Sequence, residues 1–281
     1  VIEELYKNHI GIGISIDGDR KCHDLQRTFV SGKGSYDTVK KNLLQAQRYY
    51  KNKIGTITTI TKQTAVHIEK IIEHLVLDLH ISNIKLNFVH ASTYTHGQNQ
   101  CLNTQEIADT ELRILYKIIE LQERGYDVME HNIFIKLKNL LFREYADICL
   151  SCGCCGGEKM IVFDMDGNIY PCELTDDASF VIGSIYKKES LIEQIKMTID
   201  KDKAFFKMKK AVECEKCYWK FFCRGGCTVR ALSEKRQMEV IDIDHIECAI
   251  NQVLYPALME LVLRKPHIVN QMLGEDLLVD E

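Results

Sequence analysis

The residues best suited to chemistry in this chain are cysteines, and most of them lie in its second half. Ten of the twelve cysteines fall between Cys149 and Cys248. One run spans residues 214–227 and spaces its four cysteines as Cys-x2-Cys-x5-Cys-x3-Cys. A Cys-x2-Cys pair places two thiolates on one tight turn, where both can face one metal centre. We therefore predict that this run binds metal.

Two other uses of the cysteines fit less well. Disulfide bonds are disfavoured because the chain has 281 residues, is rich in lysine and glutamate, and lacks a secretion signal. One structural zinc ion is a stronger rival, since all-cysteine zinc sites use similar pairs. Zinc needs only four ligands, however, and this half offers ten cysteines. The surplus favours iron–sulfur clusters.

A second group of cysteines precedes a predicted β-hairpin. Residues 149–155 include Cys149, Cys152, Cys154 and Cys155. The hairpin strands are expected at residues 160–163 and 168–172, with the turn at 164–167, and Cys172 ends the second strand. Cys172 thus lies one hairpin away from a cysteine-rich turn, as a second cluster requires.

The first half of the sequence has the pattern of alternating strands and helices. We expect this half to provide the framework that positions a substrate near the metal centres. Apolar or β-branched runs predict strands at residues 11–17, 54–61 and 84–90. Helices are expected at residues 35–50, 68–79 and 105–124. This order implies parallel pairing through right-handed crossovers. Chemistry in such folds sits at the carboxyl ends of the strands, which here carry Ser15, Asp17, Thr61 and His90.

Two more helices are expected in the second half. One should link the hairpin to the cysteine run over about residues 190–209, and an apolar helix should span about residues 247–264 with a kink at Pro256. The net charge of −4 gives no reason to expect nucleic acid or an anionic membrane as a partner. No apolar run approaches the ~18 residues of a membrane span. We expect a cytoplasmic protein.

The cysteine order resembles the SPASM extension of radical S-adenosylmethionine peptide and protein maturases, such as sulfatase-maturating and thioether-forming enzymes. The resemblance covers Gly-x4-Cys172, the four-cysteine run and the lone Cys248. It implies two auxiliary [4Fe–4S] clusters. Their implied ligands are Cys214, Cys217, Cys223 and Cys248 for the distal cluster, and Cys172 and Cys227 for the nearer one.

The nearer cluster also needs two ligands from residues 149–155, and the choice stays open. A Cys-x-x-Gly match favours Cys154, while the hairpin spacing also allows Cys155. Cys149 and Cys152 compete for the upstream place. The resemblance further implies that Glu173, the acidic residue after Cys172, is a catalytic general base.

The first half resembles the fourth-strand region of the partial barrel in the same enzymes. The similar segments are Ser15-Ile-Asp17-Gly18, His23-Asp24-x2-Arg27 and Gly32-Lys-Gly-Ser35. By this resemblance, Ser15, Asp17 and Arg27 belong to the cofactor-binding region, with Ser15 and Arg27 near the S-adenosylmethionine carboxylate. The implied fold is α/β, the C-terminal half of a partial (β/α)6 TIM-like barrel followed by a small cysteine-rich SPASM domain.

One departure from the family limits what this chain can do. The Cys-x3-Cys-x2-Cys motif of the cluster that cleaves S-adenosylmethionine appears nowhere in the sequence. We expect the chain to be the C-terminal part of such an enzyme, with barrel units four to six at residues 1–140. The SPASM domain is expected at residues 141–250, and a helix and tail at residues 251–281.

The resemblance implies a function for the complete enzyme. S-adenosylmethionine would be split to a 5′-deoxyadenosyl radical that abstracts hydrogen from a ribosomally made peptide or protein. The partners would be that substrate and a reductant such as ferredoxin or flavodoxin. Two alternatives remain: a degenerate peptide-binding partner protein, and a structural zinc-binding protein. On either account this chain alone is expected not to cleave S-adenosylmethionine.

Overall fold

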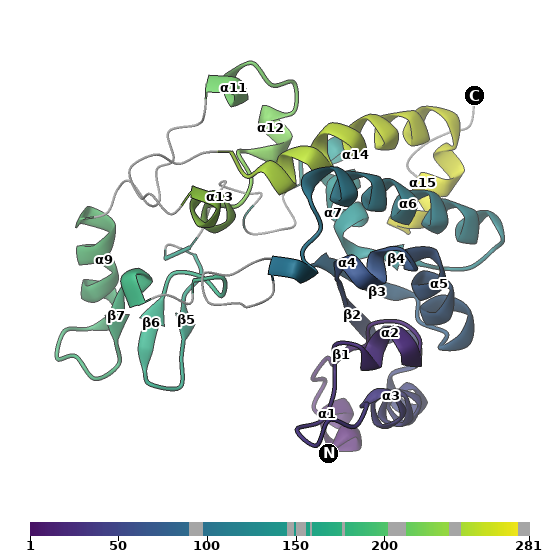
Figure 1. Ribbon diagram of the computed structural model, residues 1–281, viewed down its shortest axis with the longest axis horizontal. Helices are drawn as coiled ribbons and strands as arrows, with labels where there is room; N and C mark the ends of the chain where they lie inside the picture. The colour runs from purple at the N-terminus through teal and green to yellow at the C-terminus, as the bar shows by residue number, and fades with distance from the viewer. Residues whose placement is uncertain are drawn as a thin grey trace. The chain divides into compact units, whose positions relative to one another are not determined.

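The computed structural model describes residues 1–89, 98–144, 149, 156–157, 159–175, 178–201, 212–235 and 243–274 (Figure 1). These residues form two compact units. The sheet unit contains the described residues of Val1–Val89, Gln100–Lys138 and Val253–Glu281. The cysteine unit contains those of His90–Asn99 and Asn139–Gln252.

The sheet unit is built on four parallel strands in the order β1-β2-β3-β4. The strands are β1 (Gly13–Ser15), β2 (Gly55–Ile60), β3 (Asn83–Phe88) and β4 (Met129–Glu130). In the register, Ser15 of β1 lies beside Ile57 of β2, which lies beside Lys85 of β3. The predicted α/β class and the parallel pairing of the first three strands are confirmed.

Helices precede, connect and follow the strands of this sheet. They are α1 (Ile2–Lys7) before β1, then α2 (Arg20–Asp24), α3 (Tyr36–Tyr50), α4 (Lys62–Ala65), α5 (Ile68–Glu73) and α6 (Thr104–Glu123), and α7 (His131–Phe142) after β4. Short helical turns complete the connections: η1 (Lys51–Lys53), the π-helical η2 (His74–Asp78) and η3 (Gln98–Gln100). The three helices predicted before residue 125 therefore form, and Gly125 follows the end of α6 at a φ of +85°, a backbone conformation that favours glycine.

The core of the sheet unit lies on one face of the sheet. Ile60, Ile84 and Leu86 point to that face and are buried, as are Ile68 and Ile72 of α5. This pattern follows from strand geometry, because successive side chains point to opposite faces. The opposite face carries the more exposed residues of the same strands.

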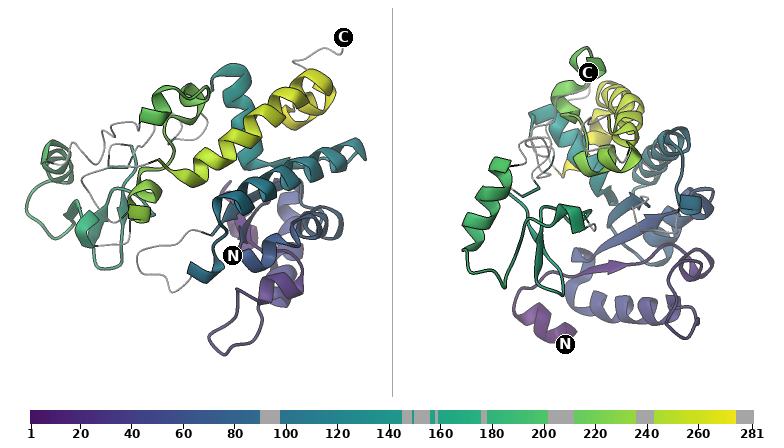
Figure 2. Two further views of the ribbon diagram at one scale, coloured as in Figure 1. Left: turned by 45° about the horizontal axis from the view of Figure 1, so that its top comes forward. Right: turned by 60° about the vertical axis from the view of Figure 1, so that its left-hand side comes forward.

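The cysteine unit contains a three-stranded antiparallel sheet. Its strands are β5 (Val162–Phe163), β6 (Asn168–Tyr170) and β7 (Gly183–Ser184), in that order. The predicted hairpin is confirmed by the β5–β6 pair, and Asp164 accepts hydrogen bonds from the backbone of Asp166 and Asn168 in its turn. Figure 2 shows α9 (Leu191–Lys201) beside this sheet. The remainder of the helix predicted to residue 209 lies outside the described residues.

The other helices of the second half are shorter, apart from one. They are η4 (Ala178–Phe180), α11 (Val212–Glu215), α12 (Lys220–Cys223), α13 (Thr228–Lys235), α14 (His245–Arg264) and α15 (Pro266–Leu273). The predicted apolar helix is α14, with Pro256 inside it. Among the described helices, α14 alone is long and apolar enough to cross a membrane, by length and composition. One third (33%) of its most apolar window is buried, and core helices of soluble proteins meet the same criteria.

Candidate functional site

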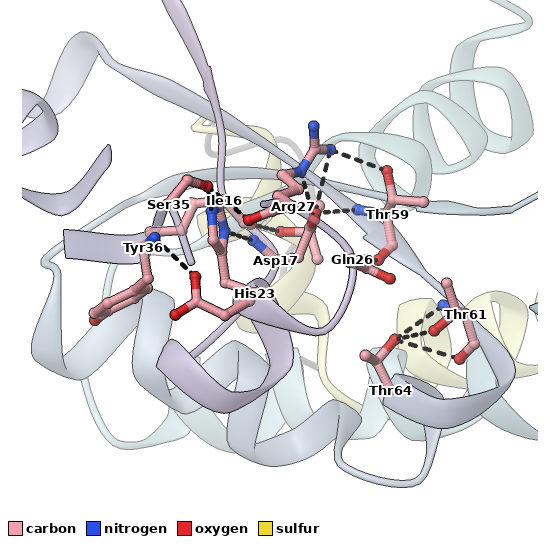
Figure 3. A network of polar contacts seen from close by, with 12 residues as sticks. Ile16, Asp17, His23, Gln26, Arg27, Ser35, Tyr36, Thr59, Thr61 and Thr64 are labelled. Atoms are coloured by element: carbon pink, nitrogen blue, oxygen red, sulfur yellow. Dashed lines mark hydrogen bonds and ion pairs between the residues drawn. The ribbon is translucent and has the colours of Figure 1, made fainter. Parts of the chain in front are cut away.

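Asp17 and Arg27 form an ion pair at the carboxyl end of β1 (Figure 3). The Asp17 carboxylate is buried and accepts from Arg27 Nε at 2.5 Å and from the backbone N–H of Thr59 at 2.8 Å. Arg27 Nη2 also donates to the Thr59 hydroxyl at 3.3 Å. The pair therefore fastens the end of β1 to the end of β2. The third guanidinium nitrogen, Nη1, makes no hydrogen bond to a described residue.

His23 joins the same network from α2. The backbone N–H of Asp17 donates to His23 Nδ1 at 3.1 Å, so the proton of the neutral ring lies on Nε2, which is 3.0 Å from the Ser35 hydroxyl. Ser35 in turn donates to the Arg27 carbonyl at 2.8 Å. Burial lowers the pKa of His23, which favours this neutral form. Four of the motif residues that resemble the maturase family thus meet in one cluster, and most of their hydrogen bonds serve the fold: Asp17, His23, Arg27 and Ser35.

The exposed face of the sheet is polar at its carboxyl end. Ser15 is exposed on this face, and Ile57 beside it is 41% exposed although β2 is an interior strand. Lys85 and Asn87 of β3 lie on the same face and are half-buried. Parallel sheets are usually apolar on both faces. Polar side chains at the carboxyl ends of parallel strands are instead typical of a ligand site. Lys85 and Asn87 were not singled out from the sequence, although their alternation with apolar residues was visible in it.

The other predicted strand-end residues have different outcomes. Thr61 is buried and forms a capping box with Thr64 at the start of α4, so its side chain serves the helix rather than a ligand. His90 lies outside the described residues. Sequence patterns alone do not separate a capping threonine from a ligand-binding one.

Glu130 is a buried carboxyl group that the sequence did not reveal. Its Oε1 accepts from the backbone N–H of Leu86 at 3.0 Å, and its Oε2 from that of Ile133 at 2.8 Å. Burial raises the pKa of Glu130 to about 7, while these hydrogen bonds act in the opposite direction. The group ties β4 and the start of α7 to β3. Its contacts are structural.

Cys172 lies two residues beyond the end of β6, and its neighbour Glu173 is exposed. The Cys172 thiol is buried and accepts a weak contact from the backbone N–H of Leu174 at 3.5 Å. The N–H of Gly157 donates to the carbonyl of Pro171 at 2.9 Å. This hydrogen bond therefore holds the backbone just after Cys155 next to the residue that precedes Cys172. Cys152, Cys154 and Cys155 lie outside the described residues.

Cys217 and Cys248 lie close together although 31 positions separate their numbers. Burial raises the pKa of Cys248, and the neighbouring Cys217 raises it further. Gln252, one turn beyond Cys248 on α14, donates from Nε2 to Cys217 Sγ at 3.7 Å. Two ligands assigned to the distal cluster by family resemblance are thus brought together.

Cys227 is held by a buried carboxylate from the start of α14. Its backbone N–H donates to Asp244 Oδ2 at 2.7 Å. Burial raises the pKa of the Cys227 thiol, and the nearby Arg230 acts to lower it. Cys214 and Cys223 flank Cys217 within the same short stretch, Cys214 inside α11 and Cys223 at the end of α12.

The donors present suit a thiolate-bound metal centre, but the described part of the chain does not assemble a full ligand set. Within that part, which omits Cys152, Cys154 and Cys155, no group of three or more metal-binding side chains is found. Cys22 and Cys101 belong to the sheet unit. Burial raises the pKa of both thiols, that of Cys22 to about 11.

The geometry described so far defines an α/β protein with a polar sheet edge and a separate cysteine-rich unit. No protein-family model matches the chain. It is 26% identical over 224 residues to the cysteine-type anaerobic sulfatase-maturating enzyme of Clostridium novyi (strain NT). That alignment covers 79% of this chain and 58% of the relative. The enzyme of the same name from Clostridium perfringens (strain 13 / Type A) is 23% identical, with 79% and 59% covered.

Solved structures give the same result for the fold. Hexahistidine-tagged anSMEcpe with bound AdoMet has a TM-score of 0.78 at 19% identity, covering 96% of this chain and 71% of that one. Native anSMEcpe with bound AdoMet and the Kp18Cys peptide has a TM-score of 0.77 at 19% identity, with 92% and 71% covered. The predicted resemblance to sulfatase-maturating enzymes is confirmed. The chain spans somewhat less than two thirds of the length of these curated relatives.

Proposed function

We propose that this chain is the C-terminal part of a radical S-adenosylmethionine/SPASM maturase that modifies a ribosomally made peptide or protein. The observation that carries the proposal is the sequence similarity to sulfatase-maturating enzymes over 79% of the chain. The sheet unit is then the C-terminal half of a partial (β/α)6 barrel, and the cysteine unit is the SPASM domain. Zinc binding is the rival use of the same cysteines.

The open sheet face is the proposed site for S-adenosylmethionine. Ser15 is exposed there, and Arg27 keeps Nη1 available beside its ion pair with Asp17. A carboxylate is the natural partner of a guanidinium nitrogen. Asp17 contributes indirectly, because it holds Arg27 in place. Support comes from the bound AdoMet in structures of similar fold.

The cysteine unit is proposed to hold two auxiliary [4Fe–4S] clusters. The distal one uses Cys214, Cys217, Cys223 and Cys248, and the contact of Cys217 with Cys248 through Gln252 supports this set. The nearer one uses Cys172 and Cys227 with two cysteines of residues 149–155, and the attachment of Gly157 beside Cys172 supports it. Such clusters, when bound, supply electron transfer and an iron site for a substrate thiolate.

Glu173 is the proposed general base. It is exposed and follows directly on buried Cys172, so a substrate beside that cysteine lies within reach of its carboxylate. The substrate is proposed to be a peptide, in line with the peptides bound in anSMEcpe. A ferredoxin or flavodoxin is the proposed reductant.

The proposal is tested by the reading frame that precedes this chain and by a product assay. We expect an in-frame Cys-x3-Cys-x2-Cys upstream. The extended protein, reconstituted anaerobically with iron and sulfide and given dithionite and S-adenosylmethionine, should then form 5′-deoxyadenosine.

The same assay on the 281-residue chain should give no 5′-deoxyadenosine, because the motif is absent from it. Product from this chain alone would contradict that expectation. A start codon directly before the chain, with no such motif, would overturn the maturase proposal in favour of a peptide-binding partner protein.

A further inference from the structure

Asp244 joins the two parts of the cysteine unit that carry Cys227 and Cys248. Its side chain is fully buried. Oδ2 accepts from the backbone N–H of Cys227 at 2.7 Å, and Oδ1 accepts from that of Glu247 at 3.1 Å. The Asp244 carbonyl also accepts from the N–H of Cys248 at 2.9 Å. One residue therefore caps α14 and holds the loop before α13.

The loop approaches Asp244 closely because of Gly226. Gly226 has a φ of +74°, and a Cβ added there would lie 2.7 Å from the Asp244 Cβ. Only glycine allows this approach without displacement. The close contact between this loop and Asp244 therefore depends on the glycine that directly precedes Cys227.

A buried charge network surrounds the same carboxylate. Arg230 Nε and Nη2 donate to Asp244 Oδ2 at 2.9 and 2.6 Å, and Nη2 also lies 3.1 Å from Glu247 Oε2. Burial alone lowers the pKa of Arg230, but the two carboxylates outweigh it and raise the pKa. Arg230 is therefore a fixed cation beside Cys227, largely neutralised by Asp244 and Glu247.

We infer that Asp244, together with Arg230, is a positioning residue that holds Cys227 and Cys248 for their clusters and sets the charge around Cys227. This inference rests on the proposed cluster function. Groups that orient metal ligands from behind are worth about 10–100-fold in metal affinity. Cluster potentials respond to nearby charge. Both effects can be measured without a substrate.

Two variants separate position from charge. Asp244→Ala removes the side-chain acceptor of the Cys227 and Glu247 N–H groups and leaves the backbone carbonyl that accepts from Cys248. We expect at least a tenfold faster loss of iron to a chelator than in the unsubstituted chain. Asp244→Asn keeps the size but removes one negative charge beside Arg230. We expect its cluster to reduce at a more positive potential, because a less compensated cation favours the reduced state.

The matched control is Asn103→Ala in the sheet unit. Asn103 caps α6 as Asp244 caps α14, accepting from the backbone N–H of Glu106 at 2.8 Å. Its loss should lower thermal stability while leaving iron retention and potential unchanged. Iron and sulfide content, chelator-induced iron loss and redox titration by electron paramagnetic resonance are measured on all four anaerobically reconstituted full chains.

The outcomes distinguish the inference from the proposed function. Iron retention and potential in Asp244→Ala and Asp244→Asn equal to those of the unsubstituted chain would overturn the inference alone. Equal iron loss in Asn103→Ala would also overturn it, because general instability would then explain the effect. An unsubstituted chain that takes up no iron would overturn the proposed clusters and the inference together.

Discussion

Single residues of the sheet unit have roles that their types alone do not reveal. The family resemblance places Asp17 in the cofactor-binding region, and in the structure its carboxylate accepts from Arg27 and from the backbone of Thr59. A buried carboxylate with these partners stabilises the junction of two strands. Under the proposed function, its part in ligand binding is indirect, through Arg27.

Asp17→Ala should destabilise the chain by about 2–3 kcal/mol, because it leaves Arg27 and the Thr59 N–H without their acceptor. The estimate is at the low end for buried pairs because the Arg27 side chain is 36% exposed. Urea unfolding under reducing conditions measures the change. Asp37→Ala is the control, since the pair of Asp37 with Arg20 is exposed and its loss should have little effect. Unchanged stability in Asp17→Ala with loss of S-adenosylmethionine binding would instead favour direct ligand contact.

Glu130 predicts a pH dependence of stability. Its pKa is raised from 4.5 to about 7 in the folded chain, so the unfolded chain binds fewer protons between these values. The free energy of unfolding should therefore fall as the pH rises through this window, by up to about 3 kcal/mol, and level off above it. In Glu130→Gln this fall should be absent. A fall of equal size in both proteins would show that another group is responsible.

At the scale of elements, the turn between α12 and α13 depends on its two glycines for different reasons. Gly225 and Gly226 both have positive φ, at +97° and +74°. An added Cβ meets nothing within 4 Å at Gly225 but meets Asp244 at Gly226.

Gly225→Ala should cost about 1–2 kcal/mol through backbone strain alone. Gly226→Ala should cost about 1 kcal/mol more, because the loop must also move away from Asp244. Urea unfolding of the two variants side by side isolates the effect of the close approach. Equal losses would mean that the loop shifts without cost.

The long elements of the first half were predictable because their patterns are local. Apolar or β-branched runs indicated β1 to β3, helical spacing indicated α5, and a capping serine and a terminal glycine indicated α3 and α6. β4 and β7 have two residues each, too short for a pattern, and they form because a neighbouring strand offers hydrogen bonds.

At the scale of the whole molecule, cysteine spacing predicts a kind of chemistry but not the geometry of its site. The run at residues 214–227 indicated metal, but spacing could not show that Cys217 meets Cys248 through Gln252. Nor could spacing show that Asp244 accepts a hydrogen bond from Cys227. The two residues are 17 positions apart, with Cys227 after a turn and Asp244 at the start of a helix. Contacts of this kind depend on tertiary packing, which one sequence does not encode in any local pattern.

The central claim is that the cysteine unit holds iron–sulfur clusters, and the metal content of the reconstituted chain tests it most directly. After anaerobic reconstitution and desalting, we expect about eight iron and about eight sulfide per chain, as two [4Fe–4S] clusters require. Replacing Cys217 and Cys248 by serine should remove about half of the iron, while Cys101→Ser should remove none. Iron near zero, or zinc as the only metal bound, would contradict the account.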